Sequence, residues 1–135
     1  RIRSEGRRLS VTILLILSML LIPMIILLIG LIWQKHPPRT INYAYGYRTR
    51  RSTASQQAWD FAHARFSKYA LWYGAAMLTV TAAAIVISLA VAAFDGLKTA
   101  ATYCLLVQVA ALGLPIALVE RELSRKFDGE GRKGD

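Results

Sequence analysis

The stretch from Leu9 to Gln34 reads LSVTILLILSMLLIPMIILLIGLIWQ and contains no charged residue. Two further uncharged runs follow, Tyr69–Phe94 and Thr99–Val119. A transmembrane helix needs about 20 predominantly apolar residues, and each run is at least that long. Since lipid offers the backbone no hydrogen-bond partner, such runs fold as helices. The sequence therefore predicts an all-α membrane protein with three transmembrane helices, at residues 9–34, 69–94 and 99–119.

The rest of the chain is short and rich in charge. The 135 residues carry a net charge of +9, and 55% are hydrophobic, so little other material remains to bury three apolar helices in a soluble core. The short connection between the second and third runs predicts an antiparallel helical hairpin, and we expect the end of the C-terminal tail to be disordered. The segments outside the runs are a basic tail at 1–8, a basic loop at 35–68, a tight turn at 95–98 and a charged tail at 120–135.

Lys and Arg residues predict the orientation in the membrane. They are more numerous in the loop 35–68 and the tail 120–135 together than in the tail 1–8 and the turn 95–98 together. Basic residues prefer the cytoplasmic side, so we predict a cytoplasmic loop and C-terminus. The arginines of residues 1–8 argue for the opposite orientation. The first run is too long for a secretory signal and lacks a small-residue cleavage site, so we expect it to remain a membrane helix.

The predicted spans contain features that govern helix packing. We expect bends at Pro23 and Pro115, because proline lacks a backbone donor. We expect Gln108 to donate a hydrogen bond to a neighbouring helix, with a role in transport as the alternative. The second span has small residues at every fourth position, which predicts close packing, either within the chain or between two copies. This stripe comprises Ala76, Val80, Ala84, Ser88 and Ala92.

The second half of the loop has the pattern of an amphipathic helix. Thr53 followed by Gln56 has capping-box spacing, with Ser52 and Ser55 as rival caps. We therefore predict an interfacial amphipathic helix between the first and second spans, over 53–68, with a bend near its end. Its apolar face is formed at three- and four-residue steps by Trp59, Ala62, Phe66 and Tyr69.

Several residues of the loop have side chains suited to fixing its conformation or to binding. Gly46 can take a positive φ or allow close approach of another segment. Asn42 and Thr49 can close backbone hydrogen bonds, and Trp59 can pack over the loop. Arg48 has a forked set of donors that can hold a carboxylate, a phosphate or the carbonyl groups at a helix end. These residues serve either the architecture or a docking surface for a cytoplasmic protein or a lipid headgroup.

As an ordered set, the loop residues resemble the signature of the SdpI family of bacterial membrane proteins. The residues that carry the resemblance are Asn42, Gly46, Arg48, Thr49, Ser55, Trp59 and His63. The resemblance covers the three-helix portion, whereas the family's namesake has further helices. It implies a bacterial cytoplasmic membrane protein with a role in toxin immunity, sensing or signalling. It also implies a protein or peptide partner.

No constellation typical of an enzyme is evident in the sequence. His36 and His63 have no cysteine or carboxylate neighbours at ligand spacing, and Asp60 with His63 fits a surface pair on a helix. We expect no catalysis, no cofactor, no metal and no nucleic acid, and we expect contact with anionic headgroups. The alternatives are an accessory structural subunit of a larger membrane complex, a small transporter or a lipid-handling protein. A homo-oligomer is also compatible with the sequence.

Overall fold

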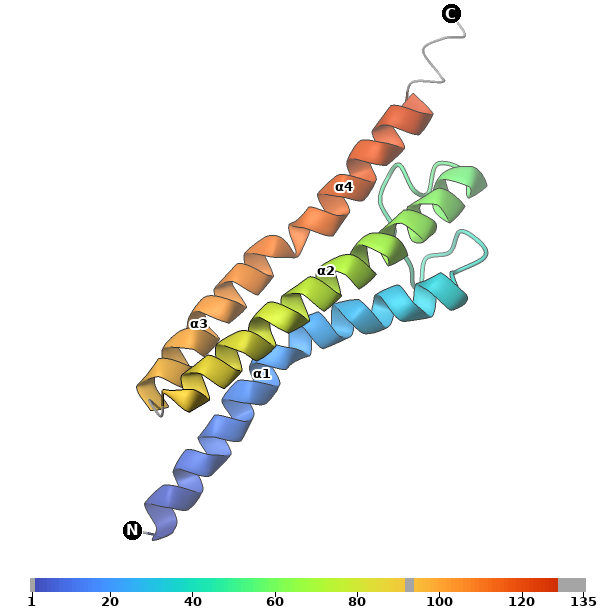
Figure 1. Ribbon diagram of the computed structural model, residues 1–135. Coiled ribbons are helices and arrows are strands. Elements are labelled where there is room, and N and C mark those ends of the chain that lie inside the picture. The colour runs from blue at the N-terminus through green and yellow to red at the C-terminus, as the bar shows by residue number, and fades with distance from the viewer. Residues whose placement is uncertain (1, 92–93, 129–135) are drawn as a thin grey trace, which may run out of the picture.

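The computed structural model describes residues 2–91 and 94–128, which are helical apart from the loop between the first two helices. Three segments are long and apolar enough to cross a membrane: Arg3–Lys35, Gln56–Ala90 and Asp95–Asp128. This finding confirms three candidate spans. The elements are α1 (Ile2–Lys35), α2 (Gln56–Ala90), α3 (Phe94–Ala111), α4 (Gly113–Leu123) and the π-helical turn η1 (Ser124–Asp128) (Figure 1).

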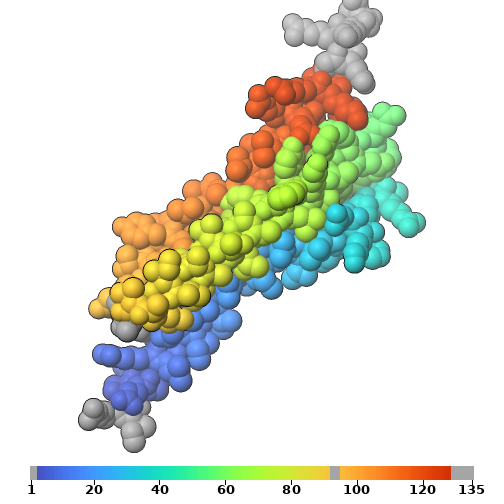
Figure 2. All heavy atoms as spheres, viewed as in Figure 1, coloured from blue at the N-terminus to red at the C-terminus, as the bar shows by residue number. Residues whose placement is uncertain are grey.

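Helix α2 packs along α1, α3 contacts both α1 and α2, and α4 contacts α2 (Figure 1). The molecule is elongated, and the N-terminal part of α1 extends beyond the hairpin of α2 and α3 (Figure 2). Helices α1 and α2 approach closely at two glycines. A Cβ at Gly30 would lie 3.0 Å from the backbone nitrogen of Leu71, and a Cβ at Gly74 would lie 3.0 Å from that of Leu27. Small residues allow such contact between backbones, which stabilises helix pairs in lipid.

A buried hydrogen-bond network joins all three spans at Gln108. Its side-chain amide donates to the carbonyl of Met19 at 3.0 Å and to Oγ1 of Thr81 at 2.9 Å. Gln108 is 2% exposed, and the surrounding core includes Ile85 and Leu97. The predicted bond from Gln108 to a neighbouring helix is therefore confirmed.

The predicted small-residue stripe forms only part of the packing face of α2. Ala84 and Ser88 are partly buried, whereas Ala76 is exposed and Val80 is 67% exposed. A residue four positions further along a helix is rotated by about 40°, so a strict four-residue stripe winds off any single face. Ala92 lies outside the described residues. The buried positions of this part of α2 are Ala70, Gly74, Thr81 and Ile85.

Three predicted segment boundaries differ from the structure. The predicted tail at 1–8 is helical from Ile2, as part of α1, and Asp95–Lys98 form the first turn of α3 instead of a connecting turn. Helices α4 and η1 extend into the predicted tail as far as Asp128. The helical pattern therefore continues past the first charged residues in all three places. The expected disorder at the end of the tail falls on residues 129–135, outside the described residues.

Both prolines affect their helices as expected. Pro115 cannot donate to the carbonyl of Ala111, and the helix is interrupted at Leu112, whose amide donates to the carbonyl of Val109 at 3.3 Å. Helix α1 contains Pro23 and bends along its length (Figure 1). The interruption at Leu112 separates α3 from α4, and α4 lies along the first turns of α2.

The predicted interfacial helix is not a separate element of the structure, because α2 runs without a break from Gln56 through Ser67 and Lys68. Helix α2 starts later than predicted. Ser55 is the cap, and its Oγ accepts the amide of Ala58 at 3.1 Å. Thr53 lies two residues before this cap, and its hydroxyl donates to the carbonyl of Thr49 at 2.8 Å. On the predicted apolar face, Trp59 and Ala62 are buried in the protein, and Phe66 and Tyr69 are partly buried against the same core.

Candidate functional site

The loop of residues 36–55 folds back over the first turns of α2, with Trp59 at the centre of the contact. Trp59 is 0% exposed, and its indole nitrogen donates to the carbonyl of Pro38 at 2.7 Å. An indole buries a large apolar area, and its one donor here has a partner. The prediction that Trp59 packs over the loop is confirmed.

Gly46 lies directly against two rings of α2. Its φ is +121°, which places it in a region that side chains disfavour. A Cβ at Gly46 would lie 2.8 Å from Nε2 of His63 and 2.9 Å from Cη2 of Trp59. Both predicted uses of this glycine, the positive φ and the close approach, therefore occur together.

His63 joins the loop to α2 through both of its ring nitrogens. Its Nε2 accepts the amide of Tyr47 at 2.8 Å, and its Nδ1 lies 2.8 Å from the carbonyl of Trp59. An amide only donates and a carbonyl only accepts, so these partners require a neutral imidazole with its proton on Nδ1. His63 is 0% exposed, and its ring lies 4.4 Å from that of Trp59 and 5.0 Å from that of Trp33. His63 therefore acts here as a structural connector.

Asn42 closes the first turn of the loop. Its Oδ1 accepts the amides of Ala44 at 3.0 Å and Tyr45 at 2.9 Å, and its Nδ2 donates to the carbonyl of Thr40 at 3.0 Å. Asparagine commonly stabilises turns in this way. The predicted backbone hydrogen bonds of Asn42 are confirmed.

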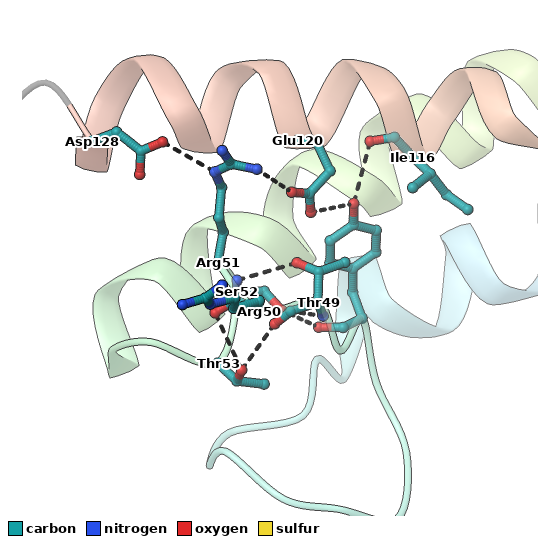
Figure 3. Close-up of polar contacts among 9 residues, drawn as sticks. Thr49, Arg50, Arg51, Ser52, Thr53, Ile116, Glu120 and Asp128 are labelled. Carbon is teal, nitrogen blue, oxygen red and sulfur yellow. Dashed lines mark hydrogen bonds and ion pairs between the residues drawn. The ribbon is translucent and has the colours of Figure 1, made fainter.

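Thr49 and Ser52 close the second turn (Figure 3). The hydroxyl of Ser52 donates to the carbonyl of Tyr47 at 2.8 Å and accepts the amide of Thr49 at 2.8 Å. In return, Oγ1 of Thr49 accepts the amide of Ser52 at 3.2 Å. Ser52 is 0% exposed. The sequence indicated the role of Thr49, but Ser52 was considered only as a helix cap.

The loop also contacts α4 through Arg51 (Figure 3), and Tyr47 makes the central connection. Its hydroxyl lies 3.0 Å from Oε1 of Glu120 and 3.2 Å from the carbonyl of Ile116. Burial, followed by the hydrogen bond and the charge of Glu120, raises the pKa of Tyr47 above its usual range, so this hydroxyl remains a donor. Arg51 pairs with Asp128 at 3.1 Å and with Glu120 at 3.4 Å.

The chain is similar to proteins of one known family. A model of the SdpI/YfhL protein family matches residues 39–119, which is more than half of the chain. The chain belongs to the SdpI/YfhL family. The curated "Uncharacterized protein YfhL" of Bacillus subtilis (strain 168) is 41% identical over 39 residues, which are 29% of this chain and 36% of that protein. The match thus spans about a third of that relative's length. No solved structure matches the chain.

Most of the predicted SdpI/YfhL motif residues have architectural contacts. Gly46, Trp59 and His63 meet in one cluster, whereas Asn42 and Thr49 close local turns. The cap of α2 is formed by the remaining small polar residue, Ser55. We call the residues joined by these contacts the loop clamp; they are Pro38, Asn42, Gly46, Tyr47, Thr49, Ser52, Ser55, Trp59 and His63.

Arg48 is the motif residue that lies outside the loop clamp. Its side chain is exposed, and its guanidinium donates to the carbonyl of Tyr43. It does not reach a helix end, which was one of its predicted roles. Exposed apolar side chains of the same loop are Ile41 at 38%, Tyr43 at 96% and Tyr45 at 61%. We call Ile41, Tyr43, Tyr45 and Arg48 the outer loop surface.

Sequence reasoning missed the contacts that tie α4 to the rest of the protein. Arg65 pairs with Glu122 at 2.9 Å, and the hydroxyl of Tyr69 also donates to Glu122. Glu120 and Glu122 fell in the predicted tail, and no local pattern paired them with the loop or α2. Val119 and Leu123 are apolar and four residues apart, which was the available sequence signal that the helix continues. In the structure both are 0% exposed.

Among residues 2–91 and 94–128, no group of three His, Cys, Asp or Glu side chains is placed to hold a metal ion. His36 is exposed at the end of α1, and His63 uses both ring nitrogens within the loop clamp. The interactions described for the loop clamp are hydrogen bonds and aromatic packing.

Proposed function

We propose that this SdpI/YfhL-family chain has a toxin-immunity, sensing or signalling role, and that it binds a protein or peptide partner without catalysing a reaction. One observation carries the proposal. The buried motif residues hold the loop clamp together, which leaves the outer loop surface free to bind a partner. Tyr and Arg are the side chains that most often dominate protein interfaces.

The outer loop surface suits binding because its backbone is already ordered. Two turns closed by Asn42 and Ser52 fix the segment that holds Tyr43, Tyr45 and Arg48. Ordering a flexible loop opposes association, so a fixed loop saves part of that cost. Arg48 uses one guanidinium nitrogen for a bond within the loop, and its other donors suit a carboxylate of the partner.

We further propose that the protein lies in the bacterial cytoplasmic membrane, with the loop and C-terminus in the cytoplasm. The loop and η1 occupy one end of the bundle, and the start of α1, the end of α2 and the start of α3 occupy the other (Figure 1). The basic residues of 35–68 support this orientation. In it, the first turns of α2, residues 56–68, lie at the cytoplasmic membrane interface.

Alanine at both Tyr43 and Arg48 should abolish partner binding without unfolding the protein. Each such interface residue contributes about 2 kcal/mol or more, so we expect recovery of the partner from mild detergent to fall more than about tenfold. Survival of cells under toxin challenge should fall in parallel. Thermal unfolding should be unchanged, because both side chains are exposed.

The control for that experiment is Arg50→Ala, which removes an exposed arginine of the same loop from outside the outer loop surface. The control should keep the partner. Undiminished binding by the Tyr43→Ala/Arg48→Ala variant would refute the proposal. Loss of folding in that variant would show that Arg48 serves architecture.

An accessory subunit of a larger membrane complex is the second candidate function. Ala76 and Val80 of the small-residue stripe are exposed, so a helix of another protein can approach α2 there. A stoichiometric membrane partner that is lost in Ala76→Leu and kept in Arg48→Ala would favour this function.

A further inference from the structure

A hollow lies between the end of α1 with the following segment and the first half of α2. Its volume is about 740 Å³, which is within the usual range for a ligand site. It lies on the face of α2 that carries Asp60, Ala64 and Lys68, and no residue of the outer loop surface lines it. The lining residues that matter here are Trp33, Arg39, Asp60, Lys68, Leu71 and Trp72.

Two cations of this hollow have no partner within the described part of the chain. The side chains of Arg39 and Lys68 are exposed and make neither a hydrogen bond nor an ion pair there. Asp60 is the carboxylate of the lining, and it accepts a hydrogen bond from Gln56 at 2.8 Å. With two cations and one anion, the lining has a net positive charge. An occupant with a net negative charge would complement it.

The lining changes from charged to apolar along α2. Asp60 and Lys68 come first, and Leu71 and Trp72 follow further into the span. From Asp60 to Trp72 the helix rises by about 18 Å, which is comparable with a lipid headgroup and the upper part of its acyl chains. Trp72 is 73% exposed, and tryptophan prefers the boundary between headgroups and hydrocarbon. The polarity of the hollow thus follows that of an amphiphile.

We propose that this hollow binds the headgroup of a phospholipid with a net negative charge. Arg39 and Lys68 hold the phosphate, and the acyl chains run along Leu71 and Trp72. Asp60 accepts a hydrogen bond from a headgroup hydroxyl, which favours a glycerol headgroup over choline, a group without donors. The site is separate from the outer loop surface, so it is independent of the proposed partner.

The test uses the full chain in nanodiscs made of phosphatidylglycerol and phosphatidylcholine in equal amounts. Native mass spectrometry then measures the lipid that remains bound to the protein after its release from the nanodisc. The unaltered chain should retain stoichiometric phosphatidylglycerol in preference to phosphatidylcholine. Arg39→Gln with Lys68→Gln should weaken retention about thirtyfold, which corresponds to about 1 kcal/mol for each cation.

The matched control is Arg50→Gln with Arg125→Gln, which removes two exposed positive charges at the same end of the protein but outside the hollow. It should retain phosphatidylglycerol as the unaltered chain does. Equal losses in both double variants would show general attraction to the membrane surface and would overturn the proposal. Retention of phosphatidylcholine without preference, or undiminished retention by the Arg39 and Lys68 variant, would also overturn it. Both double variants should unfold at the temperature of the unaltered chain.

Discussion

Replacing Gly46 by alanine should destabilise the protein by about 3 kcal/mol or more, because two penalties combine at this position. The φ of +121° is unfavourable for any residue with a side chain. The new methyl group would also lie 2.8 Å from Nε2 of His63 and 2.9 Å from the ring of Trp59. Neither ring can move away without loss of its own hydrogen bond. Thermal unfolding in mild detergent measures the effect.

Gly6→Ala is the matched control for this substitution. Gly6 lies in α1, and a Cβ there would meet nothing within 4 Å. Alanine is a better helix former than glycine by about 1 kcal/mol, so the control should unfold at the same or a slightly higher temperature. A Gly46→Ala variant as stable as the Gly6→Ala variant would show that the loop does not lie against α2 as described.

Trp59→Ala should cost about 3 to 5 kcal/mol, the usual range for removal of a large buried aromatic side chain. The indole is 0% exposed, and its removal would leave a cavity beneath the loop. It would also leave the carbonyl of Pro38 without its donor. Trp59→Phe should cost less, because the phenyl ring fills part of the space. The order of the unfolding temperatures in mild detergent tests this account.

Tyr43→Ala provides the comparison for Trp59→Ala. It also removes an aromatic ring near the motif, but that ring is 96% exposed. Surface substitutions usually change stability by less than about 0.5 kcal/mol. Equal destabilisation by Trp59→Ala and Tyr43→Ala would contradict the separation between the loop clamp and the outer loop surface.

The fold class could be predicted because lipid imposes a simple requirement. A long uncharged run such as 9–34 has few alternatives to a membrane helix. Local hydrogen bonds were also predictable in part, since Asn42 and Thr49 act on neighbouring backbone groups. Gly46 could be identified as a special position, but its contacts with His63 and Trp59 depend on tertiary packing.

The remaining contacts could not be predicted because they join distant parts of the chain. An apolar face such as that of Trp59 and Ala62 can be covered by lipid or by protein, and the pattern is the same in both cases. The bond from Tyr47 to Glu120 connects the loop with α4, and neither residue has a local feature that indicates the other. Which of the two rival residues, Thr53 or Ser55, caps α2 is likewise determined by the conformation of the preceding loop.

The motif residues divide into two groups, and we expect substitutions in the two groups to act differently. Substitutions at Gly46, Trp59 or His63 should remove function through loss of structure. Substitutions at Arg48 should remove function while the structure remains. Loss of function alone would therefore not distinguish a folding defect from a recognition defect, whereas the unfolding temperature would.

Hydrogen exchange of the Tyr47 amide, measured on the full chain in detergent micelles, tests the central claim most directly. The amide donates to Nε2 of the buried His63, so it should exchange as slowly as amides in the interior of α2. In His63→Phe the acceptor is gone, and the same amide should exchange faster. If the Tyr47 amide of the unaltered chain exchanges at the rate of an exposed peptide, the loop is not held on α2 and the account is wrong.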